Sequence, residues 1–223
     1  VPVLMNLMPA FLYALFISEI MGIGINMTGK VRYGLLSMLF VCIFGNLDAF
    51  VQLYQNISSA IIEACLPEES AFNIDWFKST RVINGTINEF PYFSFLWGDL
   101  HPHLISLPFS ALILFFALNL LKENISAISP FLRFYLFTAL SLGSLIAINS
   151  WDYPIYLIVI ILSVFIKSIS EGMRSLTKSP ILSSNTLFSC VKNFSLIVLP
   201  IVLLSLILWL PFLMNFHQAR ELK

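Results

Sequence analysis

Long apolar segments are the feature that most restricts how this chain can fold. Several of them approach or exceed the roughly 18 to 20 apolar residues that span a hydrocarbon core about 30 Å thick. Of the 223 residues, 58% are hydrophobic and only 11% are charged, whereas soluble domains carry about 25% charged residues. Because backbone groups in lipid must be hydrogen-bonded within each segment, the segments are expected to be helices. The sequence therefore predicts an all-α, polytopic transmembrane helical bundle.

The predicted bundle has about six spans joined by loops of unequal length. The spans are placed near residues 8–27, 33–51, 103–121, 132–148, 154–170 and 194–213. The longest connection, 52–102, is expected to be an extracytoplasmic loop that carries short helices. The chain opens with Val1-Pro2 and no signal-peptide pattern. We therefore interpret residues 1–223 as a single transmembrane domain that is a fragment of a longer protein.

The charges are divided unequally between the two predicted sides of the membrane. One side receives eight of the twelve basic residues: Lys30, Arg32, Lys122, Arg133, Lys167, Arg174, Lys178 and Lys192. By the positive-inside rule that side is cytoplasmic, which places the long loop outside a cell membrane. The formal net charge is zero and the chain has no basic tract, so a nucleic-acid partner is not expected. The expected partner common to all spans is the lipid bilayer.

The first polar cluster is Gly45-Asn46-Leu47-Asp48, at the predicted outer end of the second span. Asp48, Gln52 and Gln55 are four and three residues apart, so they share one face if the helix continues. A carboxylate in an apolar helix is costly unless it faces a polar cavity or partner. This pattern favours a functional Asp48. The alternative is an interfacial aspartate that simply reaches water from the end of the helix.

The second cluster, Trp97-Gly98-Asp99-Leu100-His101-Pro102-His103, directly precedes the third predicted span. Two imidazoles and a carboxylate at a helix entry can bind a divalent cation, transfer protons or hold a phosphate. Pro102 suits the first turn of a helix, so the helix is expected to begin close to it. The alternative is that Asp99 or His101 only caps that helix.

The third cluster, Asn149-Ser150-Trp151-Asp152-Tyr153-Pro154, forms the predicted outer corner between the fourth and fifth spans. Ordinary turn chemistry and an interfacial aromatic belt would also explain these residues. In the long loop, Arg81 is a suitable partner for a phosphate or for Glu89, and a simple salt bridge is an equal alternative. We expect Asp48, Asp99, His101, His103 and Asp152 to line one cavity that opens outward.

Five motifs follow one another in a fixed order along most of the chain. They are Gly45-Asn46-Leu47-Asp48, Ser79-Thr80-Arg81-Val82-Ile83, Glu89-Phe90-Pro91-Tyr92-Phe93-Ser94-Phe95, Gly98-Asp99-Leu100-His101-Pro102-His103 and Asn149-Ser150-Trp151-Asp152-Tyr153-Pro154. This set resembles the YYY-domain membrane proteins, a bacterial and archaeal family with a domain of unknown function. That family looks like the GT-C superfamily of polytopic glycosyltransferases, which use lipid-phosphate-linked sugars at the extracytoplasmic face.

The resemblance implies transfer of a sugar from a polyprenyl-phosphate donor to an acceptor that the sequence does not identify. Such a reaction needs a carboxylate base, cationic or metal help for the leaving phosphate, and an aromatic surface for the sugar. The catalytic candidates are Asp48, Asp99, His101 and His103. The substrate-binding candidates are Asn46, Arg81, Glu89, Trp97, Asn149, Trp151 and Asp152. A divalent metal, Mg²⁺ or Mn²⁺, would be held by Asp99, His101 and His103.

Three other classes of protein stay open on the sequence alone. A transporter of a polar or lipid-linked solute should place its polar groups near mid-membrane, where Glu19 is the only carboxylate deep in a predicted span. A metal-dependent membrane lipid enzyme would use the aspartate and the histidines of the second cluster as ligands, although no HExxH motif is present. A structural scaffold would explain the hydropathy but not the clustered polar residues.

Overall fold

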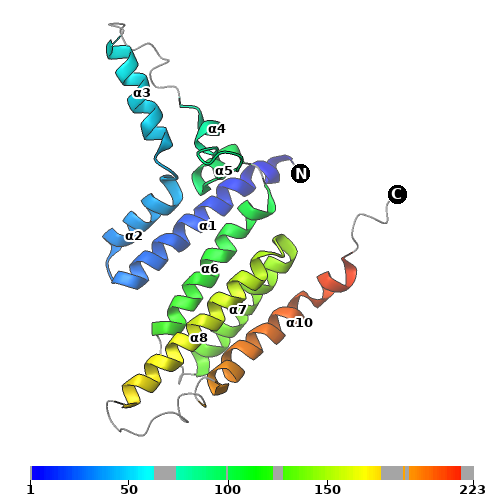
Figure 1. Ribbon diagram of the computed structural model, residues 1–223. Helices are drawn as coiled ribbons and strands as arrows, with labels where there is room; N and C mark the ends of the chain where they lie inside the picture. The colour runs from blue at the N-terminus through cyan, green and yellow to red at the C-terminus, as the bar shows by residue number, and fades with distance from the viewer. Residues whose placement is uncertain are drawn as a thin grey trace. The chain divides into compact units, whose positions relative to one another are not determined.

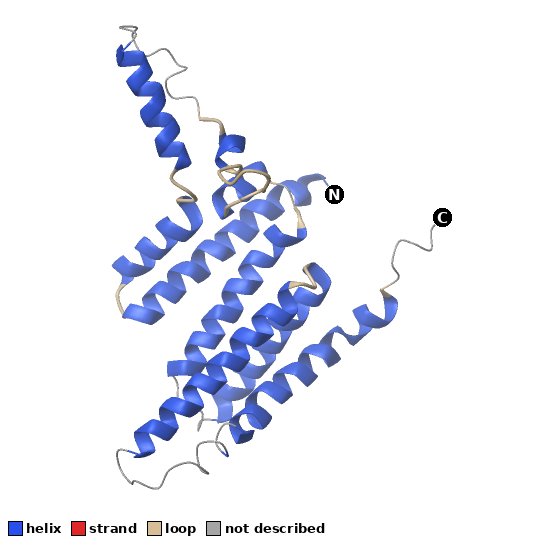
Figure 2. Ribbon diagram, in the orientation of Figure 1, coloured by secondary structure: helices blue, strands red, loops and turns tan. Residues whose placement is uncertain are grey.

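The computed structural model describes residues 2–62, 74–98, 100–122, 128–176, 188 and 191–216. The chain divides into two compact units, Val1–Leu100 and His101–Lys223. Every regular element in the described residues is a helix, as Figure 2 shows. The predicted all-α class is therefore confirmed.

The first unit begins with a hairpin of α1 (Pro2–Thr28) and α2 (Val31–Met38), which lie side by side in Figure 1. Gly29 makes the turn with a φ of 71°, a left-handed conformation that favours glycine. Glycines also allow the two helices to approach closely. A Cβ atom on Gly24 would lie 2.9 Å from the Cα of Gly34 and 2.4 Å from Ser37 Oγ. Close packing of this kind is a common way for helices to associate in lipid.

The second predicted span is broken, which corrects the prediction of one helix over 33–51. The π-helical turn η1 (Leu39–Ile43) follows α2, and Phe44 is extended with a φ of −78° and a ψ of 110°. A new helix, α3 (Asp48–Ile62), then begins, bent by 74° from the preceding helix. Asn46 starts it, because its Oδ1 accepts a hydrogen bond from the backbone N–H of Asp48 at 3.1 Å. Asparagine commonly makes this bond to the N–H two residues on, which forms a turn just before the helix.

The remainder of the first unit contains the short helices α4 (Trp76–Ser79) and α5 (Pro91–Trp97), which confirms that the long loop carries short helices. Asp75 caps α4 by accepting a hydrogen bond from the backbone N–H of Lys78 at 3.0 Å. Pro91 occupies the first turn of α5, a position that tolerates its missing N–H. Gly98 ends α5 with a φ of 63°, the usual left-handed helix stop.

The second unit packs α6 (Pro102–Lys122), α7 (Ile128–Ile148), α8 (Asp152–Leu176), η3 (Phe194–Val198) and α10 (Leu199–Asn215). Its core is mostly aliphatic, and every one of these helices contributes to it. Ile113, Leu142, Leu145, Ile160, Ile197 and Ile201 are fully buried there. At one end of the unit, the buried ammonium of Lys167 donates a hydrogen bond to the carbonyl of Leu120 at 2.8 Å. A lysine at this place satisfies a carbonyl that the end of α6 leaves without a helical partner.

The number of spans is lower than the predicted six. By length and composition, four helices in the described residues are apolar enough to cross a membrane, or five if the bent pair forms one span. The apolar part of α7, Arg133–Ile148, is a shorter helix. The four long helices are Val3–Thr28, Pro102–Lys122, Asp152–Glu171 and Val191–Asn215.

Alanine substitutions at two neighbouring glycines of α1 test the close approach of the hairpin. Alanine is normally favoured over glycine in a helix by about 1 kcal/mol, and a Cβ on Gly22 would meet nothing within 4 Å. We therefore expect Gly22→Ala to be neutral or stabilising. Gly24→Ala should instead lower the free energy of unfolding by about 1–3 kcal/mol, because the helices must move apart. Thermal unfolding of the full chain in nanodiscs measures both, and equal effects would contradict this account.

Candidate functional site

A hydrogen-bond network around Asp48 joins the start of α3 to α4 in the first unit. Asp48 Oδ2 accepts hydrogen bonds from Gln52 Nε2 at 2.6 Å and from Ser79 Oγ at 2.9 Å. Asp48 is half-buried, while Gln52 and Ser79 are 6% and 0% exposed. Asn46 adds a further link, since its Nδ2 donates to the carbonyl of Ser79. Donors fixed in this way hold the carboxylate in one orientation.

The side chain of Gln52 completes the connection between α3 and α4. Its Oε1 accepts a hydrogen bond from the backbone N–H of Asp75 at 2.8 Å, and its Nε2 donates to the carbonyl of Asp75 at 3.0 Å. The helix continues through Asp48–Ile62, so the predicted shared face of Asp48, Gln52 and Gln55 is confirmed, and Gln55 is exposed on it. Sequence reasoning missed Asp75 and Ser79 as partners. The only sequence feature that could have indicated these partners is that Ser79 is the first residue of the Ser79-Thr80-Arg81 motif.

The segment between α4 and α5 is closed by backbone and side-chain hydrogen bonds. The carbonyl of Thr80 accepts a hydrogen bond from the N–H of Asn88 at 2.8 Å. The exposed Arg81 donates from Nη1 to the same carbonyl at 3.2 Å and also to the hydroxyl of Thr80. Glu89 Oε2 accepts a hydrogen bond from Ser94 Oγ at 3.0 Å. Arg81 and Glu89 thus help to fix the local chain, and Arg81 keeps its guanidinium at the surface.

Aromatic side chains hold α4 and α5 together. The ring of Phe77 lies 5.6 Å from that of Phe93 and 4.8 Å from that of Trp97, centroid to centroid. Phe90 extends the cluster, with its ring 5.8 Å from Phe93. A Cβ atom on Gly45 would lie 2.1 Å from the ring of Phe90. Gly45 therefore lets the chain segment before α3 approach the segment before α5.

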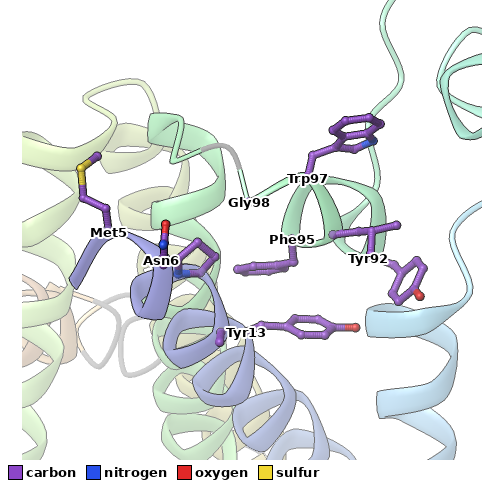
Figure 3. Close-up of a pocket in the computed structure, with 10 residues that line it drawn as sticks. Met5, Asn6, Tyr13, Tyr92, Phe95, Trp97 and Gly98 are labelled. Carbon is purple, nitrogen blue, oxygen red and sulfur yellow. The ribbon is translucent and has the colours of Figure 1, made fainter. Parts of the chain in front are cut away.

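A cavity of about 550 Å³ lies between the first half of α1 and α5. Figure 3 shows Phe95 next to Tyr13, with ring centroids 4.6 Å apart. The Tyr13 hydroxyl donates a hydrogen bond to the carbonyl of Cys42 at 2.9 Å. Trp97, which is 54% exposed, and Asn6 also line the cavity. Such a mixture of aromatic faces and a few polar groups is typical of small-molecule sites, which commonly measure about 300–1,000 Å³.

In the second unit, His101 and His103 lie at the beginning of α6. The helix starts at Pro102, as predicted. The carbonyl of His101 accepts hydrogen bonds from the N–H groups of Leu104 and Ile105 at 3.0 and 3.1 Å. Both imidazoles are exposed, and their ring centroids are 5.5 Å apart. This placement leaves both rings accessible to a ligand.

The predicted metal ligand Asp99 lies outside the described residues. Within those residues, no group of three or more His, Cys, Asp or Glu side chains is placed to hold a metal ion. Mg²⁺ and Mn²⁺ prefer oxygen ligands, and the described ligands at this point are two imidazoles. These donors alone do not fit the predicted Mg²⁺ or Mn²⁺, so no chemical step is assigned to a metal.

The corner between α7 and α8 has ordinary turn geometry. Asn149 N–H donates to the carbonyl of Leu145 at 2.8 Å, and Asp152 N–H donates to the carbonyl of Asn149 at 2.9 Å. Trp151 is 80% exposed, and the half-buried Asp152 begins α8. Because α6, α7 and α8 alternate in direction, this corner and the start of α6 are at the same end of the second unit (Figure 1).

The predicted site residues are therefore divided between the units. Asn46, Asp48, Arg81, Glu89 and Trp97 belong to the first unit. The second contains His101, His103, Asn149, Trp151 and Asp152. Within the first unit the structure joins Asn46 and Asp48 in one network. The common outward-opening cavity stays a prediction.

These features are those of a polytopic helical membrane protein. It has long apolar helices, a break in the predicted span over 33–51, and a polar loop held by hydrogen bonds. The chain belongs to the uncharacterized membrane protein family DUF2298, whose model matches residues 2–222. No curated protein and no solved structure matches it. Family membership confirms the membrane class that the hydropathy predicted.

Gln52→Leu tests whether the buried amide fixes α3 to α4. The substitution keeps a similar volume but leaves the N–H and C=O of Asp75 without their side-chain partner. We expect the free energy of unfolding to fall by about 1–3 kcal/mol. Gln55→Leu, at an exposed position of the same helix, is the matched control and should change it by less than about 0.5 kcal/mol. Chemical unfolding of the full chain measures both, and a neutral Gln52→Leu would refute the role of this amide.

Proposed function

We propose that this chain is part of a membrane-embedded, glycosyltransferase-like enzyme. It would transfer a sugar from a polyprenyl-phosphate donor to an acceptor at the extracytoplasmic face. The observation that carries the proposal is the Asp48 carboxylate, held by Gln52 and Ser79 on a helix start. The ordered motifs that resemble the YYY-domain proteins, and through them the GT-C superfamily, support the reaction class. The excess of basic residues on the predicted cytoplasmic side supports the assignment of the long loop to the extracytoplasmic face.

In this reaction Asp48 is the general base. Both donors bind its Oδ2, so the proposal assigns proton acceptance to Oδ1. The acceptor hydroxyl loses its proton to that oxygen as its own oxygen bonds to the anomeric carbon of the sugar. The bond between the anomeric carbon and the phosphate oxygen breaks, and the polyprenyl phosphate leaves with the electron pair. A positioned base contributes about 100- to 10,000-fold to such a step.

The cavity lined by Tyr13, Phe95 and Trp97 supplies a binding surface for the sugar or for the first part of the polyprenyl chain. Aromatic rings can pack against the apolar face of a sugar or against a polyprenyl chain. The amide of Asn6 can form a hydrogen bond with a sugar hydroxyl. Arg81, exposed in the same unit, is the proposed cation for the phosphate. In the second unit, His101 and His103 stay candidates for contacts with the phosphate, and Asn149, Trp151 and Asp152 stay candidates for the substrate.

Asp48→Asn tests the proposed base. Membranes containing the intact protein would be supplied with radiolabelled polyprenyl-phosphate sugars, and transfer to any membrane or soluble acceptor would be measured. We expect a loss of about 100-fold or more, because asparagine keeps the shape but cannot accept the proton. Asp75→Asn is the matched control, since asparagine caps a helix about as well as aspartate, and it should keep transfer. Unchanged transfer by Asp48→Asn, with wild-type unfolding, would exclude Asp48 as the base.

A transporter is the second candidate function, and Glu19 in α1 is the observation that favours it. Its Oε2 atom is buried and has no hydrogen-bond partner in the described residues. Carboxylates within spans often mark ion or proton pathways. The enzyme proposal predicts that Glu19→Gln keeps transfer within about twofold and that proteoliposomes with the wild-type protein show no proton flux. Proton flux by the wild type that Glu19→Gln abolishes would favour the transporter.

A further inference from the structure

Helix α3 has two chemically different faces. Asp48, Gln52, Gln55 and Ser59 follow one another at spacings of three and four residues and form the polar face. Phe50, Leu53, Ile57 and Ile61 form the opposite face at the same spacings, with Tyr54 beside them. The polar face is occupied, because Asp48 and Gln52 bind α4. The apolar face is open: Phe50 is 54% exposed, Tyr54 74% and Ile61 73%.

The direction of α3 does not continue the direction of the helix before it. It is bent by 74° from the helix over Val31–Ile43, which is antiparallel to α1, a helix long and apolar enough to cross a membrane (Figure 1). A helix of this length is about 22 Å long. At this bend it advances only about 6 Å along the direction of α2. This direction favours a helix that lies along the membrane plane over one that crosses the hydrocarbon.

We infer that α3 lies in the interface of the lipid bilayer, with Phe50, Tyr54, Ile57 and Ile61 in contact with lipid. Because α4 covers part of the polar face, the open apolar face is the one that would meet the membrane. The expected depth is about 5–10 Å into the boundary between headgroups and acyl chains. This inference does not depend on the proposed enzymatic activity.

The charge of α3 specifies the kind of lipid surface. Asp48 is the only charged residue between positions 48 and 62, and the helix has no lysine or arginine. Electrostatic attraction to anionic lipids, worth about 1 kcal/mol for each basic residue, therefore does not contribute. Burial of the apolar face alone must hold the helix. The docking surface is accordingly a neutral, zwitterionic interface.

The position of α3 has a consequence for Asp48. The aspartate lies on the polar face of the same helix, so an interfacial α3 holds its carboxylate at the level of the lipid headgroups. The network with Gln52 and Ser79 then lies in the headgroup layer. A headgroup or a lipid-linked phosphate would reach this level without leaving the membrane.

Depth measurements on pairs of residues seven positions apart test this inference. Nitroxide labels would be placed on p-acetylphenylalanine introduced at Tyr54 and Ile61 of α3, in the full chain in phosphatidylcholine nanodiscs. This chemistry leaves the native cysteines unlabelled. The matched control pair is Leu203 and Leu210 of α10, also seven residues apart and 51% and 49% exposed. Collision rates with oxygen and with a water-soluble nickel chelate give the depth of each label.

We expect both α3 labels to be shallow, accessible to oxygen and within about 5 Å of each other in depth, while the α10 pair differs by about 10 Å. Replacing half of the phosphatidylcholine by phosphatidylglycerol should leave these depths unchanged. A depth difference in α3 as large as that in α10 would show a spanning helix and overturn the inference. Labels that neither reagent reaches would indicate a covering protein surface and would also overturn the inference. Labels fully accessible to nickel, or insertion that requires the anionic lipid, would do the same.

Discussion

Hydrocarbon offers no hydrogen bonds, so each backbone N–H and C=O within the membrane must find its partner in the protein. In both units long helices meet this requirement. At the ends of the helices, the backbone N–H and C=O groups need partners outside the helix. Single side chains provide these hydrogen bonds. Asn46 bonds the start of α3 and the carbonyl of Ser79, and Lys167 bonds the carbonyl of Leu120 at the end of α6. These polar groups satisfy the helix ends that the apolar surface leaves without partners.

The same constraint explains how the second unit accommodates many hydroxyl side chains. Ser163 and Ser168 donate back to the carbonyls of Val159 and Val164, one helical turn earlier. Their hydroxyls are thereby satisfied within the helix, and their small size allows close packing. Gly143 has a similar packing role, since a Cβ there would lie 2.2 Å from the Trp209 ring. These residues are explained by packing without any chemical function.

In the first unit several polar side chains from distant segments bond one carboxylate. Asp48, Gln52 and Ser79 come from segments about thirty residues apart in the chain and meet in one network. The cavity beside Tyr13 and Phe95 belongs to the same unit. The proposed enzymatic function rests on this oriented carboxylate and on the aromatic-lined cavity in the same unit. In the inferred position of α3, its open apolar face attaches this unit to the membrane surface.

The sequence by itself determined the membrane class, the start of α6 at Pro102 and the common face of Asp48 and Gln52. Each of these depends on local chemistry: transfer of apolar side chains into lipid, the fixed φ of proline, and the helical period. Only the tertiary structure decided the break between Ile43 and Asp48 and the partners Asp75 and Ser79. Hydropathy averages over a window, and the apolar face of α3 keeps that average high although the helix turns by 74°. Partners that fold back from a distant segment leave no periodic signal, because their distance in sequence is set by the path of the loop.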